Sequence, residues 1–391
     1  MREPCTIAVG GHICLDIIPS FRPHSATTFG ELLVPGKLLN VDAAVLGTGG
    51  AVSNTGLALH RLGMPVRLMG KVGDDALGAT ILSLLRKHAG TPGAEAALVG
   101  GMIVDPAAAT SYTVVLNPPG IDRCFLHCPG ANDVFRASDV TPGRLGDAGL
   151  FHFGYPPLMK TMYEDGGVEL SGMFASIRAG GITTSLDMTL PDPSSPSGQV
   201  DWPAILARTL PQVDFFVPSV DELVYMLERG RFDAMMADSL RGVPLGGLVA
   251  ADIRALADKA IALGAAAVMI KLGTQGACLR VTDDVDRLRA CGRGGPADPE
   301  AWRGAEFHAP CFHADVVGTT GSGDCAIAGF LAGVVQGFGP GESLRWAVAT
   351  GSASVERADS VSGVPSAAAL AGRMAAGWPR DPFDIDFPSR V

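Results

Sequence analysis

The segment with the clearest chemical character is Gly318–Asp324, which reads Gly-Thr-Thr-Gly-Ser-Gly-Asp and leads directly into the apolar run Cys325–Val335. Small residues let the backbone approach a ligand closely, and the first turn of a helix offers unpaired N–H groups and a partial positive charge. This combination predicts a cradle for a phosphate group. Asp324 also stands where aspartate commonly caps a helix, and spacing alone does not separate a cap from a functional carboxylate.

Two other nucleotide-binding loops do not occur in the sequence. The G-x-x-x-x-G-K-[ST] pattern is missing, because Gly36-Lys37 and Gly70-Lys71 are followed by leucine and valine. Gly47-Thr48-Gly49 is similar to the start of a dinucleotide fingerprint, but Val52 fills its last glycine position and no predicted strand directly precedes it. The sequence therefore indicates neither a Walker-type loop nor a dehydrogenase.

Apolar, β-rich runs alternate with Ala- and Leu-rich segments along most of the chain. This alternation is typical of an α/β protein whose parallel sheet is covered by helices on both faces. The expected strands are Thr6–Val9, Val66–Lys71, Gly149–Gly154, Thr183–Asp187, Asp214–Pro218, Ala267–Leu272 and Ala277–Val281. The expected helices are Gly49–Leu62, Ala76–His88, Gly166–Ala179, Asp221–Glu228, Ala251–Leu263 and Cys325–Val335.

Three stretches depart from this alternation. Residues 17–46 and 101–128 have extended β character, and in the second the runs Ser111–Asn117 and Cys124–Cys128 are joined through Pro118-Pro119-Gly120, a hairpin-like connection. Together they predict a small separate sheet. Residues 282–306 are rich in Gly, Arg and Asp, which predicts an extended surface loop.

Composition narrows the class of partner. The 391 residues carry 40 acidic and 30 basic side chains, a formal net charge of −10, and 47% are hydrophobic. An acidic chain without a basic stripe is a poor binder of nucleic acid or of an anionic membrane, so we expect a small-molecule partner. The N-terminus lacks the pattern of a secretion signal, and eight cysteines are too dilute for a disulfide scaffold, so we expect a cytoplasmic protein.

The motifs together resemble those of the ribokinase (PfkB) family of carbohydrate kinases, whose signature D-T-T-G-A-G-D also leads into a glycine-containing helix. Gly318–Asp324 is the matching segment here. The resemblance runs along the whole chain in order, and this collinearity makes it specific. The other matching segments are Gly10–Asp16, Gly49–Asn54, Gly70–Asp75 with Gly78, Arg123–Phe125, Pro129–Asn132, Pro218–Leu223 and Lys271–Gly276.

The resemblance implies a ribokinase-like fold, a Rossmann-like three-layer α/β sandwich with a predominantly parallel central sheet and a small β-sheet lid. Residues 1–391 would form one catalytic domain, with a discontinuous lid from about 17–46 and 101–128. The implied activity is transfer of the γ-phosphoryl group of ATP to a hydroxyl, a hydroxymethyl group above all, of a sugar or sugar-like substrate. Relatives often pair lid strands between subunits, so a homodimer is expected.

The same resemblance assigns the catalytic residues. Asp324 is the base that accepts the hydroxyl proton, and the amides of Gly321, Ser322 and Gly323 hold the charge of the transferring group. A carboxylate beside an N–H cradle suits phosphoryl transfer, which asks the protein mainly for positioning and charge stabilisation. The residues that the resemblance places at the substrate are Asp16, Gly49, Gly50, Asn54 and Asn132.

The resemblance also implies which residues bind the nucleotide and the metal ion. The resemblance places Lys271, Gly273, Gly276 and Thr319 at ATP, together with Gly321 and Gly323. Glu222 matches a glutamate that organises Mg²⁺ largely through water, as suits a cation that keeps its hydration shell.

The sequence departs from the family pattern at two positions. Ser219 replaces the asparagine of the N-x-x-E motif, and Gly318 replaces an aspartate that contributes to a monovalent-cation site in many relatives. Activation by potassium is therefore left open. The rival interpretations are a nucleoside kinase on the same scaffold and a catalytically silent protein that senses sugar or nucleotide; the intact Asp324 and its glycine-rich loop favour an active enzyme.

Overall fold

A sheet of eight strands forms the centre of the protein in this computed structural model, which describes residues 3–90, 92–239, 247–383, 385, 387 and 391. Its strands are β1 (Ile7–Gly11), β4 (Val66–Met69), β9 (Leu150–Gly154), β10 (Thr183–Leu186), β11 (Phe215–Phe216), β12 (Ala267–Lys271), β13 (Ala277–Val281) and β14 (Glu306–Ala309). Their order is β14-β13-β12-β11-β10-β9-β1-β4. Neighbours from β12 to β4 are parallel, while β13 runs antiparallel to β12 and β14.

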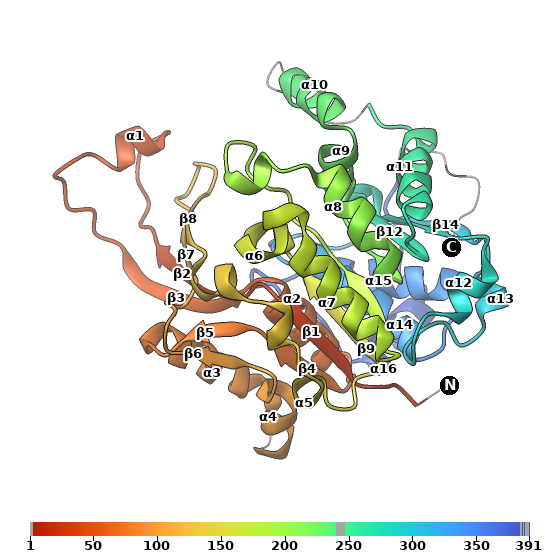
Figure 1. Cartoon of the computed structure of the whole chain (residues 1–391). Coiled ribbons are helices and arrows are strands. Elements are labelled where there is room, and N and C mark those ends of the chain that lie inside the picture. Colours follow the sequence, from red (N-terminus) through yellow and green to blue (C-terminus); the bar gives the residue numbers. More distant parts are fainter. Residues whose placement is uncertain (1–2, 91, 240–246, 384, 386, 388–390) are drawn as a thin grey trace.

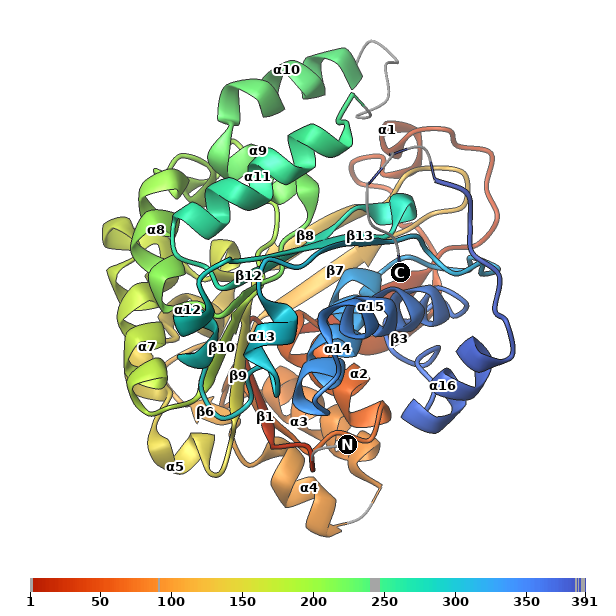
Figure 2. The same cartoon turned by 90° about the vertical axis from the view of Figure 1, so that its right-hand side faces the viewer.

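Helices cover both faces of this sheet. The α-helices of the described residues are α1 (Phe29–Leu32), α2 (Ala51–Arg61), α3 (Ala76–Ala89), α4 (Pro92–Val99), α5 (Pro142–Leu145), α6 (Lys160–Tyr163), α7 (Val168–Ala179), α8 (Trp202–Thr209), α9 (Val220–Leu227), α10 (Arg229–Ser239), α11 (Ala250–Ala262), α12 (Val285–Arg289), α13 (Pro299–Trp302), α14 (Ser322–Val335), α15 (Pro340–Ser354) and α16 (Ala367–Ala375), of which α1 lies beyond the small sheet described below (Figure 1). In Figure 2, α7 and α8 lie on one side of the strands and α2, α14 and α15 on the other. This is the α/β sandwich that the alternating pattern predicts.

Each face of the sheet has its own apolar core. One cluster includes Leu57 of α2, Phe330 of α14 and Leu344 of α15. The second includes Phe174 of α7 and Leu206 of α8, with side chains of α9 and α11. Within the described ranges, no helix is long and apolar enough to cross a membrane.

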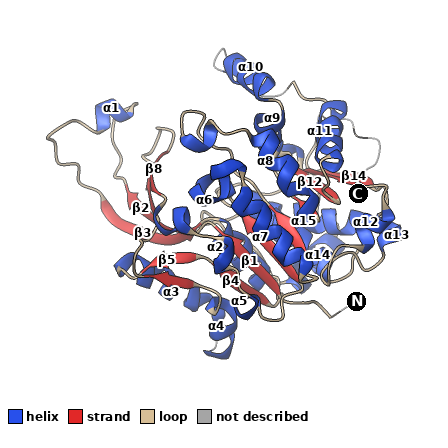
Figure 3. Cartoon of the chain, viewed as in Figure 1, coloured by secondary structure: helices blue, strands red, loops and turns tan. Residues whose placement is uncertain are grey.

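A smaller four-stranded sheet stands apart from the central one (Figures 1 and 3). Its strands are β2 (Cys14–Ser20), β3 (Asp42–Gly49), β7 (Tyr112–Leu116) and β8 (Cys124–Cys128), in the order β3-β2-β7-β8. The hairpin β7–β8 turns at Gly120, which has a φ of 78°, a value that glycine tolerates. Part of the expected segment 101–128 lies elsewhere, because β6 (Ile103–Asp105) pairs with β5 (Lys71–Gly73) in a separate two-stranded sheet.

Several expected elements have somewhat different limits, and in two of them the shift has a clear local reason. The helix expected from Gly49 begins at Ala51, because Gly49 ends β3 and Gly50 has a φ of 90° that is incompatible with a right-handed helix. The strand expected over Val66–Lys71 breaks at Gly70, so that β4 stays in the central sheet and β5 leaves it.

The expected extended surface loop at 282–306 is wrong. The segment contains α12 and α13, and Leu288, Cys291 and Trp302 are buried. The chain between these helices crosses the end of the central sheet, where Gly294 N donates to the carbonyl of Gly149 at 3.0 Å. The prediction failed because the segment is polar in composition and only a few of its apolar residues are buried.

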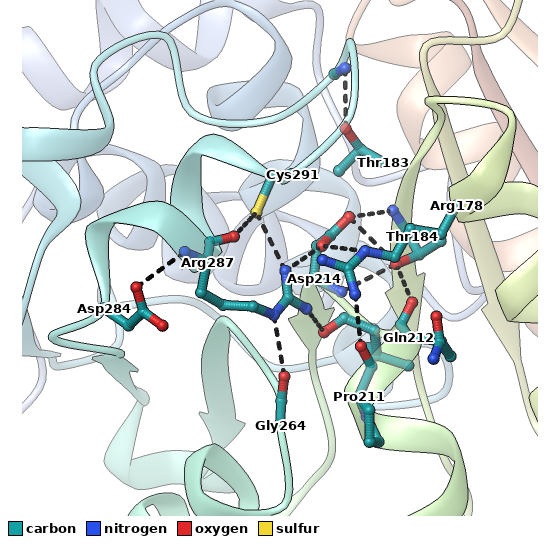
Figure 4. Close-up of polar contacts among 12 residues, drawn as sticks. Arg178, Thr183, Thr184, Pro211, Gln212, Asp214, Gly264, Asp284, Arg287 and Cys291 are labelled. Atoms are coloured by element: carbon teal, nitrogen blue, oxygen red, sulfur yellow. Dashed lines mark hydrogen bonds and ion pairs between the residues drawn. The ribbon is translucent and has the colours of Figure 1, made fainter.

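A buried carboxylate ties this segment to the sheet, as Figure 4 shows. Asp214, which directly precedes β11, is fully buried, and Arg287 of α12 donates to its Oδ1 at 2.7 Å. The backbone N–H and the hydroxyl of Thr184 donate to Oδ2 at 2.9 and 3.2 Å. Arg178 lies 3.9 Å from Oδ1. A charge buried among these donors is tolerated because each carboxylate oxygen is paired.

We expect Arg287→Ala to lower the free energy of unfolding by about 3 kcal/mol, because it leaves the carboxylate of Asp214 buried with less compensating charge. Urea unfolding measures the change. Arg289→Ala on the same helix is the matched control, since Arg289 pairs with Asp286 and Glu300 at the surface, where an ion pair contributes less than about 1 kcal/mol. Equal losses in the two variants would contradict the assignment.

Candidate active site

Asp324 lies in the first turn of α14 and is only 2% exposed. The amide nitrogen of Asn54 donates to its Oδ2 at 3.0 Å, and the hydroxyl of Tyr155 donates to the same oxygen at 2.7 Å. The hydroxyl of Thr55 donates to Oδ1 at 3.2 Å. Asp324 is therefore no helix cap: the cap position belongs to Gly321, and the carboxylate faces side chains from α2 and from the end of β9.

The electrostatics of Asp324 reflect this burial. Burial raises the pKa of the Asp324 carboxyl above its ordinary value. The hydrogen bond from Tyr155, the charge of Lys271 and the hydrogen bonds from Asn54 and Thr55 all act in the opposite direction. These donors and the charge of Lys271 therefore offset part of the effect of burial on the ionised carboxylate, and the pKa stays above its ordinary value.

Close packing requires glycine at position 321, before α14, whereas Gly323 lies in ordinary contact distance of its neighbours. Gly321 has a φ of 74°, and a Cβ there would lie 2.5 Å from Cβ of Ser360. A Cβ at Gly323 would lie 3.4 Å from Cδ of Lys271. The loop therefore brings the positive end of α14, a helix of 14 residues, against the site without side chains in between.

A cavity of about 580 Å³ lies against this loop, a size typical of small-molecule sites. The predicted residues that line it are Gly321, Gly323, Asp324, Glu222, Lys271 and Gly273. The cavity is also lined by Tyr155 and Thr189, which follow β9 and β10, and by Ile253 of α11. It lies at the carboxyl ends of the parallel strands, where open α/β sheets bind ligands.

A buried ion pair stands beside the cavity. Lys271 Nζ lies 2.6 Å from Oδ1 of Asp187, which directly follows β10 and is 1% exposed. Burial lowers the pKa of Lys271, but the carboxylates of Asp187, Glu222 and Asp324 outweigh it and raise the pKa, so the ammonium stays charged. Oδ2 of Asp187 is buried and accepts no hydrogen bond from the described residues.

Glu222 and Ser219 form a capping box at the start of α9. The hydroxyl of Ser219 accepts from the N–H of Glu222 at 3.4 Å, and the Glu222 carboxylate accepts from the N–H of Ser219 at 2.6 Å. Serine at this position thus has a local role that favours the helix start. The carboxylate of Glu222 also lines the cavity, near the charges of Asp187 and Lys271.

The donor set suits Mg²⁺ held largely through water. Glu222 and the unpaired oxygen of Asp187 are hard oxygen donors, which Mg²⁺ prefers. Within the described part of the chain, no three His, Cys, Asp or Glu side chains are arranged to bind a metal directly. These residues therefore fit a cation that keeps most of its waters.

A second polar group lies on one face of the small sheet. The strand register places Asp16 beside Gly47 and Thr113, with His127 beyond Thr113. His127 Nδ1 lies 2.9 Å from the hydroxyl of Thr113. The row brings short acceptors and donors together, as recognition of hydroxyl groups requires.

Asp16 is the charged member of this row. Burial raises its pKa to about 6, although a hydrogen bond from the Cys14 thiol acts against the rise. Gly49 and Gly50 leave space for the side chains of Asp16 and His12. A Cβ at Gly49 would lie 2.4 Å from Oδ2 of Asp16, and one at Gly50 would lie 2.6 Å from Nδ1 of His12.

The two predicted asparagines are held by contacts within the protein. Asn54, in the first turns of α2, donates to Asp324 and accepts from the hydroxyl of Ser360 at 2.8 Å, so it links the carboxylate to the rest of the site. Asn132 is fully buried; its oxygen accepts from Ile13 N at 3.1 Å and its nitrogen donates to Ile13 O at 3.0 Å. It holds the backbone just before Asp16.

Three of the predicted catalytic and nucleotide residues lie outside the residues that line the cavity, as do all the predicted substrate residues. Gly276 forms the turn between β12 and β13, with a φ of 88° and a Cβ position only 2.0 Å from the carbonyl of Ala309. Ser322 donates from its hydroxyl to the carbonyl of Thr319 at 3.0 Å, and Thr319 is exposed. These residues shape the loops around the site.

Thr55, Tyr155 and Asp187 contribute to the site but were missed in the sequence analysis. Asp187 and Tyr155 carry a usable signal, because each stands at the end of an expected strand and the carboxyl ends of parallel strands converge. Thr55 follows Asn54 directly. The sequence alone does not show that Thr55, Tyr155 and Asp187 lie close to Asp324.

One contact joins the small sheet to the glycine-rich loop. Arg123, in the connection between β7 and β8, donates from Nη1 to the hydroxyl of Thr320 at 2.9 Å. Its guanidinium lies 5.6 Å from the ring centroid of Phe125. The hairpin therefore contacts the residue just before Gly321. This contact brings the polar row of the small sheet and the residues around Asp324 into one site.

The chain is similar to known proteins in sequence and in fold. The family model described as pfkB family carbohydrate kinase matches residues 24–89 and 170–367. Fructokinase-1 of rice is 27% identical over 142 residues, which cover 34% of this chain and 42% of that enzyme, so the chain spans less than half the length of this curated relative.

Solved structures show the same fold. Ribokinase of Arabidopsis thaliana in complex with ribose and ATP superposes with a TM-score of 0.68 at 18% identity, covering 95% of this chain and 98% of that one. A putative ribokinase II of E. coli in complex with ATP and Mg²⁺ superposes with a TM-score of 0.63 at 19% identity, covering 95% of this chain and 99% of that one.

Because the pKa of Asp16 is raised, we expect its contribution to the free energy of unfolding to depend on pH. A carboxyl whose pKa rises from 3.8 to about 6 on folding binds protons more tightly in the folded state, so its contribution to stability falls as pH rises through this window. Asp16→Asn removes the charge, and we expect it to stabilise the ligand-free protein by about 2 kcal/mol at pH 8 and by nearly nothing at pH 4. Urea unfolding at the two pH values measures this difference.

Asp122→Asn, at an exposed carboxylate of the same sheet, is the control and should leave stability unchanged at both pH values. A gain from Asp16→Asn that is equal at pH 4 and pH 8 would show that ionisation of Asp16 is not its cause.

Proposed function

This chain belongs to the pfkB family of carbohydrate kinases, and we propose that it transfers the γ-phosphoryl group of ATP to a hydroxyl, above all a hydroxymethyl group, of a sugar or sugar-like substrate. The observation that carries the proposal is the placement of Asp324: a buried carboxylate in the first turn of α14, beside Gly321 and Gly323 and open to the cavity. A base next to an N–H cradle is what phosphoryl transfer to an alcohol requires.

In this proposal Asp324 orients the acceptor hydroxyl and takes its proton. The N–H groups at the start of α14, over Gly321–Gly323, stabilise negative charge on the transferring group, as donors at a helix N-terminus do. Lys271 adds a fixed positive charge that the paired Asp187 holds in place. These are positioning and electrostatic roles, which supply most of the catalysis in this class of reaction.

The cavity is the proposed ATP site. Gly273 and Thr274 line it on the side of β12, and Leu248 and Ile253 supply apolar walls suited to a base. Glu222 and Asp187 would hold Mg²⁺ through water. Bound Mg²⁺ would neutralise phosphate charge during transfer. Gly318 leaves a role for a monovalent cation open, since that position offers no side-chain oxygen.

The acceptor is proposed to bind between Asp324 and the row that contains Asp16, Thr113 and His127. The small sheet, built from 14–20, 42–49, 112–116 and 124–128, would then act as a lid on the central sheet within a single catalytic domain. The contact of Arg123 with Thr320 supports this arrangement, because it closes the hairpin onto the glycine-rich loop.

We further propose that the outer face of the small sheet pairs two copies of the chain. The register aligns Leu46, Ile17, Val114 and Leu126 across all four strands, on the face opposite Asp16 because side chains alternate along a strand. Leu46 and Leu126, at the two edge strands, are 46% and 56% exposed. Ile17 packs partly against the central core, and burial in a symmetric dimer would stabilise the exposed ends of the row.

The first experiment measures ATP consumption with Mg²⁺ against pentoses, hexoses, keto-deoxy sugar acids and nucleosides. We expect one acceptor class to be phosphorylated, and we expect Asp324→Asn to lower kcat by about 10²–10⁴-fold, because it removes the base but keeps the shape of the side chain. Asp258→Asn, at an exposed carboxylate of α11, is the control and should keep full activity.

Phosphorylation of a nucleoside alone would replace the sugar kinase proposal with a nucleoside kinase on the same fold. Nucleotide binding without turnover of any acceptor would favour a silent sensing protein instead. Full activity in Asp324→Asn would reject Asp324 as the base.

The dimer has its own test. We expect light scattering after size exclusion to give twice the mass of one chain, and Leu126→Asp to shift the protein to the monomer because it places a charge in the apolar row. Val168→Asp, at an apolar residue of α7 that is 54% exposed, is the matched control and should leave the mass unchanged. A wild-type mass of one chain would end the proposal.

A further inference from the structure

Tyr155 has a backbone conformation that tyrosine rarely adopts. Its φ of 68° and ψ of 41° lie in the left-handed region, and among the described residues the other non-glycine with positive φ is Asp165, in an exposed turn. Asparagine and aspartate tolerate this region, whereas a bulky side chain there is an outlier. Such outliers persist where the surrounding structure holds them, and they gather at functional sites.

The surroundings of Tyr155 show what holds it. It stands between Gly154, which ends β9, and the buried Pro156, so the chain turns sharply at the carboxyl end of the sheet. The turn directs the ring into the cavity and the hydroxyl onto Oδ2 of Asp324 at 2.7 Å. The ring centroid lies 6.2 Å from that of His12, whose Nε2 lies 3.4 Å from Nε2 of His127, so Tyr155 approaches the polar row of the small sheet through His12.

The hydrogen bonds of Asp324 are divided unequally between its oxygens. Oδ2 accepts from both Asn54 and Tyr155, while of the described residues Thr55 alone donates to Oδ1. A carboxylate oxygen accepts about two hydrogen bonds. Oδ2 is therefore saturated by the protein, and Oδ1 retains capacity for one further donor.

We propose that Tyr155 is a positioning residue for Asp324, which with Asn54 occupies Oδ2 so that the acceptor hydroxyl is directed to Oδ1. The inference rests on the proposed kinase function and adds the atom that takes the proton. In the transfer, the acceptor oxygen bonds to the γ-phosphorus as its O–H proton passes to Oδ1 and the bond to the leaving ADP oxygen breaks. The proton on Asp324 then returns to solvent before the next turnover.

The charges around Asp324 make the phenol a suitable partner. Lys271, Asp187 and Glu222 are the ionisable groups from β12, β10 and α9 that face this region. Burial and the nearby carboxylates of Asp324, Asp187 and Glu222 raise the pKa of Tyr155 well above its ordinary value. The hydroxyl therefore stays protonated at every working pH and always donates.

The test is the pH dependence of kcat/KM in Tyr155→Phe, which keeps the ring and removes the donor. Loss of a hydrogen bond to the ionised carboxylate raises the pKa of Asp324, so we expect the acid limb of the profile to move up by about 1–2 pH units. Activity should fall about 10-fold or more near the limb and recover at high pH. Tyr163→Phe, at a half-buried tyrosine of α6 that faces Asp133 and Glu164, is the control and should not move the limb.

A loss of rate that is equal at all pH values would mean that Tyr155 only supports the fold, and it would overturn the inference. The pKa of Asp324 can also be measured without turnover, from the carboxyl carbon signal in ¹³C NMR, assigned by its loss in Asp324→Asn. An unchanged pKa in Tyr155→Phe rejects the inference even if no acceptor is found. An inactive wild type with a shifted pKa would reject only the kinase proposal.

A crystal structure with acceptor and a non-hydrolysable ATP analogue tests the choice of oxygen. We expect the acceptor hydroxyl within about 2.6–3.2 Å of Oδ1, with Tyr155 still on Oδ2. An acceptor bound to Oδ2, with the tyrosine displaced, would overturn the assignment.

Discussion

The structure of the site depends on burying one carboxylate, Asp324, among donors that offset its loss of water. A lone buried charge is strongly disfavoured, so the protein must compensate it. Tyr155, Asn54 and Thr55 do so with three hydrogen bonds, and Lys271 with a positive charge. Because Asp324 and these residues come from four different parts of the fold, the relative placement of β9, α2, α14 and β12 is a condition for the proposed chemistry.

Lys271 creates a second requirement. A buried ammonium needs its own counter-charge, and Asp187 supplies it at 2.6 Å. Asp187, Glu222 and Asp324 thus share one cation beside the cavity. Glu222 and Oδ2 of Asp187 leave oxygen donors for a further cation, which agrees with the use of Mg²⁺ in the proposed reaction.

The small sheet has two different faces, because side chains alternate along each of its strands. One face presents Asp16, Thr113 and His127 to the site, and the opposite face presents an apolar row that includes Leu46 and Leu126. A shift of register by one residue would exchange the two faces. The proposed substrate recognition and the proposed subunit pairing would therefore depend on the same strand alignment. The ionised carboxylate of Asp16 lowers the stability of the fold, because burial raises its pKa to about 6.

Local sequence determined much of this protein: the alternation of strands and helices, the separate hairpin region, the glycine-rich loop before α14 and the candidate residues Asp324, Asp16 and Glu222. These features depend on periodicity and on residue types that one segment contains by itself. The tertiary structure decided what depends on contacts between distant segments: that Asn54 binds Asp324 across 270 positions, that Tyr155 is forced into a left-handed conformation, and that the polar segment 282–306 packs inward through Trp302 and the pair Arg287–Asp214. No pattern in a single segment records such contacts, because they arise only when the sheet brings the ends of its strands together.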